Sequence, residues 1–335
     1  MERRGFRWRD AGQGTIARVI LGSVLGILAL WLATRRVDWG LLRESLRGIR
    51  YEFAVLALLI NLATLPAQAV RWRILFYPDD RHLPMTPLFK GVVLAQMLNI
   101  LVPARLGEVA RVYALGTQPN IGRIRILSTI VVEKVLDLCA VAASVTLLLF
   151  AVSLPGWLRD SGRVLLAGSA LILAAGFILL RRGDKLTGWC ERQAAKLSGR
   201  WGEVLSRLGR STLDGFSALR HTHSNIRLWT ITIVIMLLAA ATNYVLFLAF
   251  GFRLPLTAAL FLLIVLQVGV APPSLPGKIG VFNYLVVLGL SVYSIDGSVA
   301  FSYSIVLYAV AFLPKIILGS VILAIPHKSY AVGHE

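Results

Sequence analysis

Long apolar runs constrain this chain more than any other feature, because they recur along almost its whole length. Several approach or exceed the ~20 residues that a helix needs to span a bilayer. Of the 335 residues, 57% are hydrophobic and only 16% are charged. The sequence therefore predicts an all-α polytopic membrane protein with one membrane domain over residues 1–335. The candidate helices are 16–34, 53–76, 88–102, 127–152, 164–180, 229–250, 256–271, 280–295 and 299–325.

The net charge of +18 fits a membrane protein better than a nucleic-acid-binding protein, because Lys and Arg accumulate on cytoplasmic loops. Residues 181–228 form the one long polar stretch, and their basic, amphipathic pattern predicts a cytoplasmic segment at the membrane interface. We expect both termini on the same cytoplasmic side of an inner or plasma membrane. The two cysteines show no disulfide or zinc-type spacing.

Two breaks rich in proline and glycine interrupt the chain next to its shortest apolar runs, 88–102 and 256–271. At 1.5 Å per residue these runs reach only ~22–24 Å, against a hydrocarbon core of ~30 Å. Short, interrupted segments in corresponding positions of two halves are typical of transporter binding sites. The predicted break residues are Pro103 and Gly107 in the first half, and Pro272, Pro276, Gly277 and Gly280 in the second.

The basic segments also predict how the breaks face the membrane. The first helical hairpin should enter and leave on the inside, and the second on the outside. We therefore expect about six to eight transmembrane helices plus two opposed re-entrant hairpins, in an inverted repeat of about 53–152 and 229–325. Residues 164–180 and 181–228 would join the repeats. Segment 35–51 is either an interfacial amphipathic helix or a sign that the first crossing is misplaced, and the sequence leaves both open.

Cations at both breaks predict an anion site. A helix that starts after a break presents free N–H groups and the positive end of its dipole, and basic side chains beside it suit a phosphate head group. The alternative is that the arginines are ordinary cytoplasmic or snorkelling residues. Candidate substrate-binding residues are Arg105, Arg111, Lys278, Asn99, Asn283 and Arg71.

Acidic residues accompany these cations. Glu108 lies three residues from both Arg105 and Arg111, a spacing that makes helical neighbours, and a second charged group lies inside the apolar run 127–152. Ionisable groups at such depth usually face a bundle interior or cavity. They would balance the arginine charges or couple transport to a proton, and an internal ion pair that fixes packing is the alternative. The candidates are Glu108, Glu133, Lys134 and Asp137.

Further polar residues lie within the apolar runs. Lys315 follows Pro314 in the last run, where the proline permits a kink. The amides predict interhelical hydrogen bonds; they are Gln68, Gln96, Gln267, Asn99 and Asn243.

Enzyme signatures are missing from the sequence. We found no HExxH, GxSxG or Walker A motif and no His/Cys metal spacing. We therefore expect no catalytic residues, no metal and no cofactor.

Three stretches together resemble a known family. "NILVPARLGEVAR", the downstream "VVEKVLD" and the later "PPSLPGKIGVFN" are similar to the flippase-like membrane region of lysylphosphatidylglycerol synthases, and the resemblance covers about residues 16–325. It implies translocation of a charged or phosphorylated lipid between leaflets. The family typically has glutamate where Asn283 stands, and often glycine where Lys278 stands. No acyltransferase domain follows residue 325, so we expect a stand-alone member without the aminoacyl-transfer step.

The function that these features predict is flippase- or scramblase-type translocation of a phosphorylated or charged lipid. The ligand would be an anionic phospholipid or a polyprenyl-phosphate-type lipid, and not a nucleic acid. One alternative is a membrane-embedded enzyme that acts on lipid-linked sugar or phosphate. Another is a scaffold subunit of a lipid or envelope pathway, recruiting a partner through its basic segment. Whether the protein forms a homo-oligomer is left open.

Overall fold

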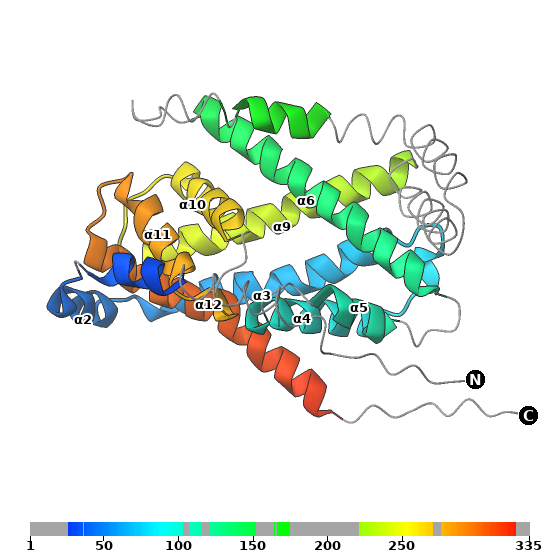
Figure 1. Ribbon diagram of the computed structural model, residues 1–335, viewed down its shortest axis with the longest axis horizontal. Coiled ribbons are helices and arrows are strands. Elements are labelled where there is room, and N and C mark those ends of the chain that lie inside the picture. Colours follow the sequence, from blue (N-terminus) through cyan, green and yellow to red (C-terminus); the bar gives the residue numbers. More distant parts are fainter. Residues whose placement is uncertain are drawn as a thin grey trace, which may run out of the picture.

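The computed structural model describes residues 26–35, 37–102, 107–115, 121–151, 164, 166–174, 221–270 and 276–325. All regular secondary structure in these ranges is helical (Figure 1). Residues 26–34 and 166–174 are helical. The other elements are α2 (Trp39–Arg47), α3 (Tyr51–Ile74), η1 (Asp79–His82), α4 (Met85–Leu101), α5 (Gly107–Leu115), α6 (Arg123–Ala151), α9 (Thr222–Ala249), α10 (Leu256–Gly269), η2 (Pro276–Lys278), α11 (Val281–Ser291) and α12 (Gly297–Ala324).

Several predictions fall on residues that lie outside the described ranges. They concern the start of the first predicted helix, residues 181–220 of the basic segment, the candidate substrate-binding residue Arg105, and the break residues Pro103 and Pro272.

Helices α3, α9 and α12 are long and apolar enough to cross a membrane, with 24, 28 and 28 residues. At 1.5 Å per residue they are ~36–42 Å long, which exceeds the ~30 Å hydrocarbon core. Large apolar side chains on their outer faces, such as Leu59, Leu237 and Leu313, are exposed. Such a surface suits lipid rather than water, and the chain is a helical membrane protein.

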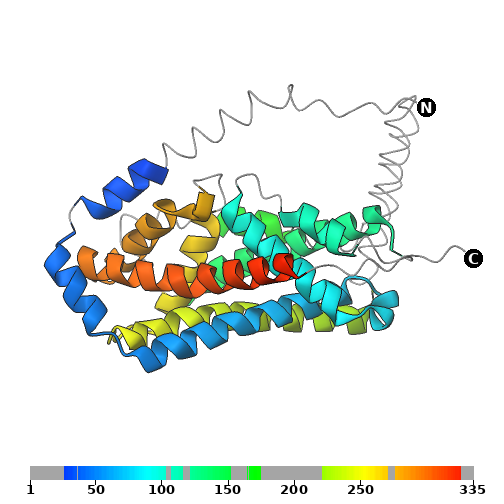
Figure 2. The same ribbon diagram turned by 90° about the horizontal axis from the view of Figure 1, so that it is seen from below.

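Helices α3 and α9 pack along each other and run in opposite directions (Figure 2). The N–H of Arg50, just before α3, donates to the C=O of Ala249 at the end of α9 (3.0 Å). At the other end, Leu228 near the start of α9 packs in one cluster with Ile74 near the end of α3. Helix α12 also contacts α3. These contacts form the frame against which the shorter helices pack.

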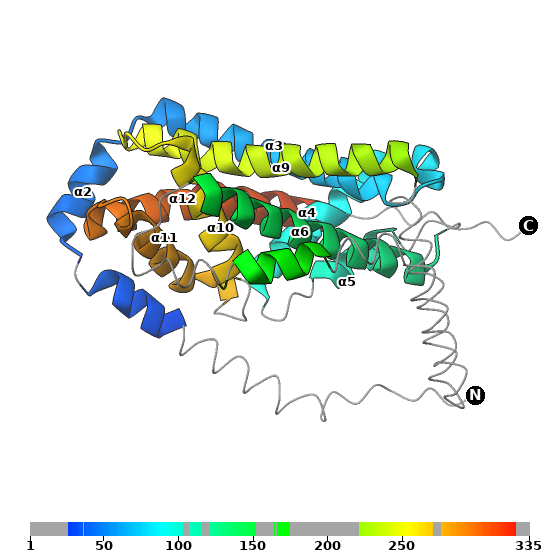
Figure 3. The ribbon, with the colours of Figure 1, turned by 90° about the horizontal axis from the view of Figure 1, so that it is seen from above.

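The shorter helices form two pairs, which we call the first pair (α4 and α5) and the second pair (α10 and α11). The members of each pair contact each other. The first pair packs against α3, α6 and α12, whereas the second packs against α9, α12 and α6 (Figure 3). In addition, α4 contacts η2, which lies in the break of the second pair. The helix break between α10 and α11, which contains η2, therefore lies against α4 of the first pair.

The second break needs backbone that glycine adopts easily. Gly277 and Gly280 have φ angles of 78° and 85°, and Lys278 between them has a φ of 59°. A Cβ at Gly280 would lie 2.1 Å from the carbonyl oxygen of Gly26. Glycine at 280 is thus required both by the positive φ and by the close approach of the first helical segment.

Segment 35–51 contains the short helix α2. A helix in this segment was one of the two alternatives that the sequence allowed. The side chain of Asp38 caps it by accepting from the N–H groups of Gly40 and Leu41 (2.7 and 3.2 Å). The N–H of Asp38 donates to Ser298 Oγ (3.0 Å), which ties α2 to the start of α12. No α2 residue is fully buried, as expected of a helix on the surface of the bundle.

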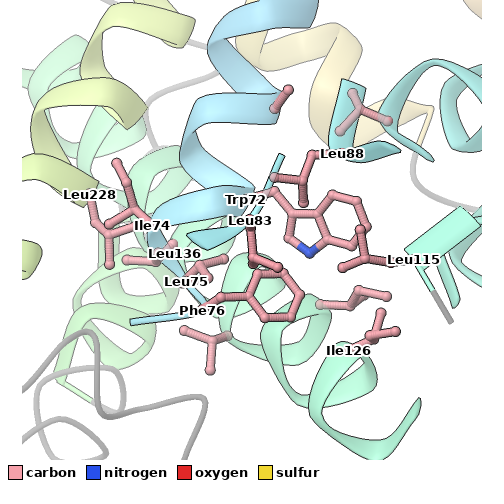
Figure 4. Close-up of a cluster of buried hydrophobic side chains, with 14 of the residues drawn as sticks. Trp72, Ile74, Leu75, Phe76, Leu83, Leu88, Leu115, Ile126, Leu136 and Leu228 are labelled. Atoms are coloured by element: carbon pink, nitrogen blue, oxygen red, sulfur yellow. The ribbon is translucent and has the colours of Figure 1, made fainter. Parts of the chain in front are cut away.

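Two apolar clusters form the core. The first surrounds Trp72 and Phe76 at the end of α3 and includes side chains from α4, α5 and α6 (Figure 4). The second lies among α9, α10, α11 and α12 and contains the fully buried Tyr303 and Phe247. Each cluster contains side chains of one of the two helix pairs, and each also includes residues from the other half of the chain, such as Leu228 in the first cluster and Ala57 in the second.

Candidate functional site

Six charged residues from α3, α5 and α6 meet in one group, which we call the charge cluster (Arg71, Glu108, Arg111, Glu133, Lys134 and Asp137). At its centre, Glu133 accepts from Arg71 Nη2 at 3.1 Å and from Arg111 Nη1 at 2.6 Å. The side chains of these three residues are only 4% exposed. One buried carboxylate therefore joins two arginines that come from different helices.

The other three members lie at the rim of the cluster. Asp137 Oδ1 accepts from Arg71 Nη1 at 2.6 Å, and Lys134 Nζ lies 3.0 Å from Glu108 Oε1. Arg111 Nε lies 3.7 Å from Glu108 Oε2, close enough for an ion pair but too far for a hydrogen bond. The side chains of Asp137 and Lys134 are 41% and 48% exposed. The cluster has three cations and three carboxylates, so its formal charge is zero.

The indole ring of Trp72 packs against the charge cluster. Its indole Nε1 donates to Thr129 Oγ1 (3.0 Å), which fixes the ring between α3 and α6. The guanidinium carbon of Arg111 lies 5.1 Å from the ring centroid, within the range of a cation–π contact. The ring thus gives Arg111 a second favourable partner in a site that water does not reach.

The geometry brings several of the predicted charge-balancing residues together. Arg111 lies beside Glu108, its expected neighbour three residues away, and it also pairs with Glu133 of α6. Asp137 pairs with Arg71, and Arg71 is buried in the interior, so its alternative role as a snorkelling anchor is wrong. Both arginines already hold carboxylate partners, whereas a head-group site needs cations that can exchange their partners.

The two asparagines proposed to bind substrate each serve a helix start. Asn99 Oδ1 accepts from the N–H of Gly107, the first residue of α5 (2.9 Å). Asn283 Oδ1 accepts from the N–H of Gly280 (3.3 Å), and its Nδ2 donates to Ser304 Oγ (2.8 Å). Both breaks therefore use an asparagine to satisfy a glycine N–H, which membrane interiors otherwise leave without a partner.

A second site is a cavity of about 280 Å³ between the second pair, α3, α9 and α12, which we call the lysine cavity. Lys278 from η2 and Lys315 from α12 both line it, and no carboxylate is found among the described residues of its lining. Gln267 also lines it and is exposed, so the cavity reaches the surface. The remaining lining residues are Asn61, Ala239, Thr242, Asn243, Leu263, Leu266, Val270, Phe282, Leu307, Ala311 and Phe312.

Asn61 contributes unused hydrogen-bonding capacity to the lysine cavity. Asn61 is 8% exposed, and its side-chain amide oxygen has no hydrogen-bond partner among the described residues. A buried polar atom without a partner costs about 1–3 kcal/mol. An unpaired acceptor on the wall of a cavity is therefore a place where a ligand with a donor gains affinity.

A polar face of α3 connects the lysine cavity with the charge cluster. Asn61, Thr64, Gln68 and Arg71 are spaced by three, four and three residues, which places them on one face of a helix. Gln96 Nε2 of α4 donates to Gln68 Oε1 (2.7 Å) between the two sites. From Asn61 to Arg71 this face rises ~15 Å, about half of the hydrocarbon core.

Sequence reasoning missed Asn61 and gave Lys315 no part in the site. The polar period at 61, 64, 68 and 71 inside an apolar run was the signal that could have revealed the face of α3. For Lys315, only the fold shows that it shares a cavity with Lys278. Of the amides predicted to make interhelical bonds, Gln68 and Gln96 bond each other, and Asn243 Nδ2 donates to the carbonyl oxygen of Ala259 on α10 (3.2 Å).

Long apolar helices with a lipid-suited surface and a polar interior define a multi-pass membrane protein. Residues 19–319 match the family described as the lysylphosphatidylglycerol synthase TM region. The match covers most of the chain, which therefore belongs to this family, as its motifs predicted.

Two curated relatives are similar to the chain. A UPF0104 membrane protein of Methanothermobacter thermautotrophicus is 24% identical over 332 residues, covering 93% of this chain and 96% of the relative. Glycosyltransferase AglD of Haloferax volcanii is 25% identical over 150 residues, which is 45% of this chain and 24% of AglD. The first similarity extends over nearly the whole chain, whereas the second involves a part of each protein.

Proposed function

We propose that the protein translocates a lipid with a phosphorylated or charged head group between the leaflets of the membrane, as a flippase or scramblase. The observation that carries the proposal is the polar face of α3, which runs from the lysine cavity to the charge cluster inside a protein with an apolar exterior. A head group could move along polar side chains while its acyl chains remain in lipid. Membership of the lysylphosphatidylglycerol synthase TM family agrees with this role.

The proposal includes an inverted repeat, in which α3–α6 correspond to α9–α12. The contacts between helices support this pairing. Helix α3 contacts α4 as α9 contacts α10, and α5 contacts α6 as α11 contacts α12. Across the halves, α4 contacts α12 as α10 contacts α6. An exchange of the two halves thus turns one set of contacts into the other, as a pseudo-twofold axis requires.

In this arrangement the two pairs are re-entrant hairpins from opposite sides, with both termini and the basic segment 181–228 on the cytoplasmic side. Helices α4 and α10 have 17 and 14 residues, so they rise only ~21–26 Å and end inside a ~30 Å core. Backbone that ends at this depth is tolerated where protein or a wet cavity surrounds it. Asn99 and Asn283 supply such partners at the two breaks.

The charge cluster would have two roles in this mechanism. Arg71, Glu133 and Arg111 hold the first pair against α3 and α6, because one carboxylate bridges both arginines. Glu108 and Asp137 at the rim are the carboxylates that a passing head group or a proton would reach. Coupling to a proton would act through these two groups.

Vesicles with fluorescent phospholipids and the purified protein test the proposal. We expect leaflet exchange that depends on protein, and a drop of at least tenfold for Gln68→Met, because this variant removes hydrogen-bonding groups from the middle of the polar face with little change in side-chain size. Ser128→Ala is the control, since the Ser128 hydroxyl donates to the carbonyls of Ile124 and Arg125 on its own helix. Absence of exchange by the wild type for every lipid offered would refute the function, and full activity of Gln68→Met would refute the path.

A second candidate is a membrane enzyme that acts on a lipid-linked sugar or phosphate, with Glu108 or Asp137 as base. The partial similarity to glycosyltransferase AglD favours it. Product formation from a labelled lipid donor by the purified protein, abolished in Asp137→Asn, would support the enzyme over the transporter.

A further inference from the structure

We propose that the lysine cavity binds a polyol ring, a sugar or cyclitol, so that the preferred cargo is a lipid whose head group carries such a ring. This inference rests on the proposed function and narrows its class of head group. The shared chemistry of the ligand is a ring of hydroxyl groups, which either a lipid head group or a free sugar or cyclitol could supply.

Neutral polar side chains form one part of the lining of the lysine cavity. They are Asn61 from α3, Thr242 and Asn243 from α9, and Gln267 from α10. Amide and hydroxyl groups offer both donors and acceptors of hydrogen bonds, as the hydroxyls of a polyol do. This part of the lining can therefore bond a ligand at several points without any contribution from charge.

Asn61 is the residue that gains most from a ligand. It lies ~15 Å from the start of α3, near the middle of a helix ~36 Å long. Only 8% of the residue is exposed, and its amide oxygen has no hydrogen-bond partner among the described residues. An unpaired acceptor is costly at this depth. Because the terminal torsion of asparagine is soft, a small turn of the amide brings this oxygen to a hydroxyl donor in the cavity.

Two neighbours on α9 also keep acceptor positions. Thr242 Oγ1 donates to the carbonyl of Leu238 (2.9 Å), which leaves the lone pairs of its oxygen to accept. Asn243 is fixed by its Nδ2, which donates to the carbonyl of Ala259 (3.2 Å), and by its backbone carbonyl, which accepts from Tyr303 Oη (3.2 Å). Its amide oxygen is a further acceptor. A ligand with several hydroxyl donors can satisfy these acceptors, whereas the phosphate of a diester brings only acceptors.

Aromatic rings form another part of the lining. Phe282 of α11 and Phe312 of α12 line the cavity and pack edge to face, with ring centroids 5.2 Å apart. Tyr308 packs against both, at 5.7 and 4.7 Å. A sugar or cyclitol ring has hydroxyls around its edge and C–H groups on its faces. Its faces can therefore pack on the aromatic surface while its hydroxyls bond the amides.

The two lysines of the cavity do not decide between lipids of equal charge. Lys278 Nζ lies 5.5 Å from the ring centroid of Phe312, within the range of a cation–π contact, and Lys315 follows Pro314 on α12. A negative phosphate would interact with them whether or not its head group carries hydroxyls. A test of the inference must therefore hold the charge of the lipid constant and vary its hydroxyls.

Size agrees with a single ring. A volume of about 280 Å³ corresponds to the liquid volume of about nine water molecules at ~30 Å³ each. One sugar or cyclitol ring fits in this volume. The cavity reaches the surface at Gln267, which is exposed, so the chain that links the ring to its lipid can leave there.

Binding to the full-length protein in phosphatidylcholine nanodiscs, measured by native mass spectrometry, tests the inference without any transport step. Phosphatidylinositol and phosphatidylethanol are the matched probes, because both are phosphodiesters with the same charge and only the first has hydroxyls on its head group. We expect phosphatidylinositol to bind about fivefold more tightly, as one additional net hydrogen bond would give. Asn61→Leu should bring this ratio close to one.

Asn225→Leu is the matched control. Asn225 also has an amide oxygen without a hydrogen-bond partner among the described residues, but it lies outside the lining, ~27 Å from Asn243 along α9. Its ratio should equal that of the wild type. Both variants should fold, because each replaces an unpaired polar atom by an apolar side chain of similar size.

Two results would overturn the inference. One is equal affinity of the wild type for the two lipids, a measurement that depends on no variant. The other is a ratio in Asn61→Leu that stays at the wild-type value or falls no further than in Asn225→Leu, since the hydroxyls would then not be recognised at Asn61.

The remaining outcomes separate the inference from the proposed function. Preference for phosphatidylinositol without any leaflet exchange would leave the inference in place and refute translocation. Leaflet exchange without this preference would refute the inference alone. Free myo-inositol that displaces phosphatidylinositol at equal concentration would keep the polyol class and assign the site to the free ring. Failure of myo-inositol to displace it would assign the site to the lipid head group.

Discussion

Replacement of Glu133 by glutamine tests whether one carboxylate holds the first pair in place. Glu133 is the common partner of Arg71 and Arg111, at 3.1 and 2.6 Å, and all three side chains are buried. Glutamine keeps the size but removes the charge, so two buried guanidinium groups lose their shared partner. Breaking a buried ion pair from one side costs ~3–5 kcal/mol. At ~2 °C per kcal/mol for a large domain, the melting temperature should fall by ~6–10 °C.

The assay is thermal unfolding in one detergent at a fixed scan rate, followed by intrinsic fluorescence. The control is Asp79→Asn. Asp79 Oδ2 lies 2.6 Å from Arg125 Nη1, as short as the Glu133–Arg111 pair, but the Asp79 side chain is 59% exposed. An exposed pair contributes only ~0–1 kcal/mol, so the control should move by ~2 °C or less. The double variant Glu133→Gln/Arg111→Met should recover part of the loss, because one uncompensated charge is gone. A fall in Glu133→Gln no larger than in the control would refute the reasoning.

Two further predictions concern packing and capping. Gly319→Ala should lower the melting temperature by ~2–6 °C, because its Cβ would lie 2.5 Å from Met97 Sδ and overpacking costs ~1–3 kcal/mol. Gly297→Ala, which has open space around its Cβ, should be close to neutral, and equal effects of the two variants in the same melting assay would contradict the packing. Asn99→Ala should lower stability by ~1–3 kcal/mol, because the buried N–H of Gly107 loses its acceptor. Leaflet exchange by the folded variant in the vesicle assay should stay unchanged, and a large loss of exchange with normal stability would show that Asn99 belongs to the substrate site.

Local chemistry explains which parts of the fold could be predicted. A membrane helix needs a run of apolar residues whose backbone bonds close within the run, so α3, α9 and α12 are visible in sequence as continuous segments. The breaks are equally local, since proline and glycine act on their own backbone. Both short runs next to them, α4 and α10, are helices of 17 and 14 residues. For helix α2 the sequence supports two alternatives, because its amphipathic period fits either an interfacial helix or a misplaced first crossing.

The candidate site was predictable only in part, because pairs of charges do not determine their own partners. Spacing within one helix predicts that Arg111 and Glu108 are neighbours, and in the structure Arg111 Nε lies 3.7 Å from Glu108 Oε2. The partners Arg71 and Glu133 are 62 residues apart in sequence, and no local rule relates them. Arg71 also lies two residues before the basic Arg73 at the end of a helix, a position that from sequence alone favours a snorkelling role over a buried one.

By itself, the sequence determined that this is a helical membrane protein with two broken segments, together with the residues that occupy the breaks. Those properties follow from the chemistry of each segment in lipid. The tertiary structure alone decided which charges meet and which share a cavity. It paired Arg71 and Arg111 with one shared carboxylate, Glu133, and brought Lys278 and Lys315 into the lining of one cavity. The physical reason is that electrostatic and hydrogen-bond partners are chosen by the packing of helices that are distant in the chain, and this packing depends on all of their faces at once.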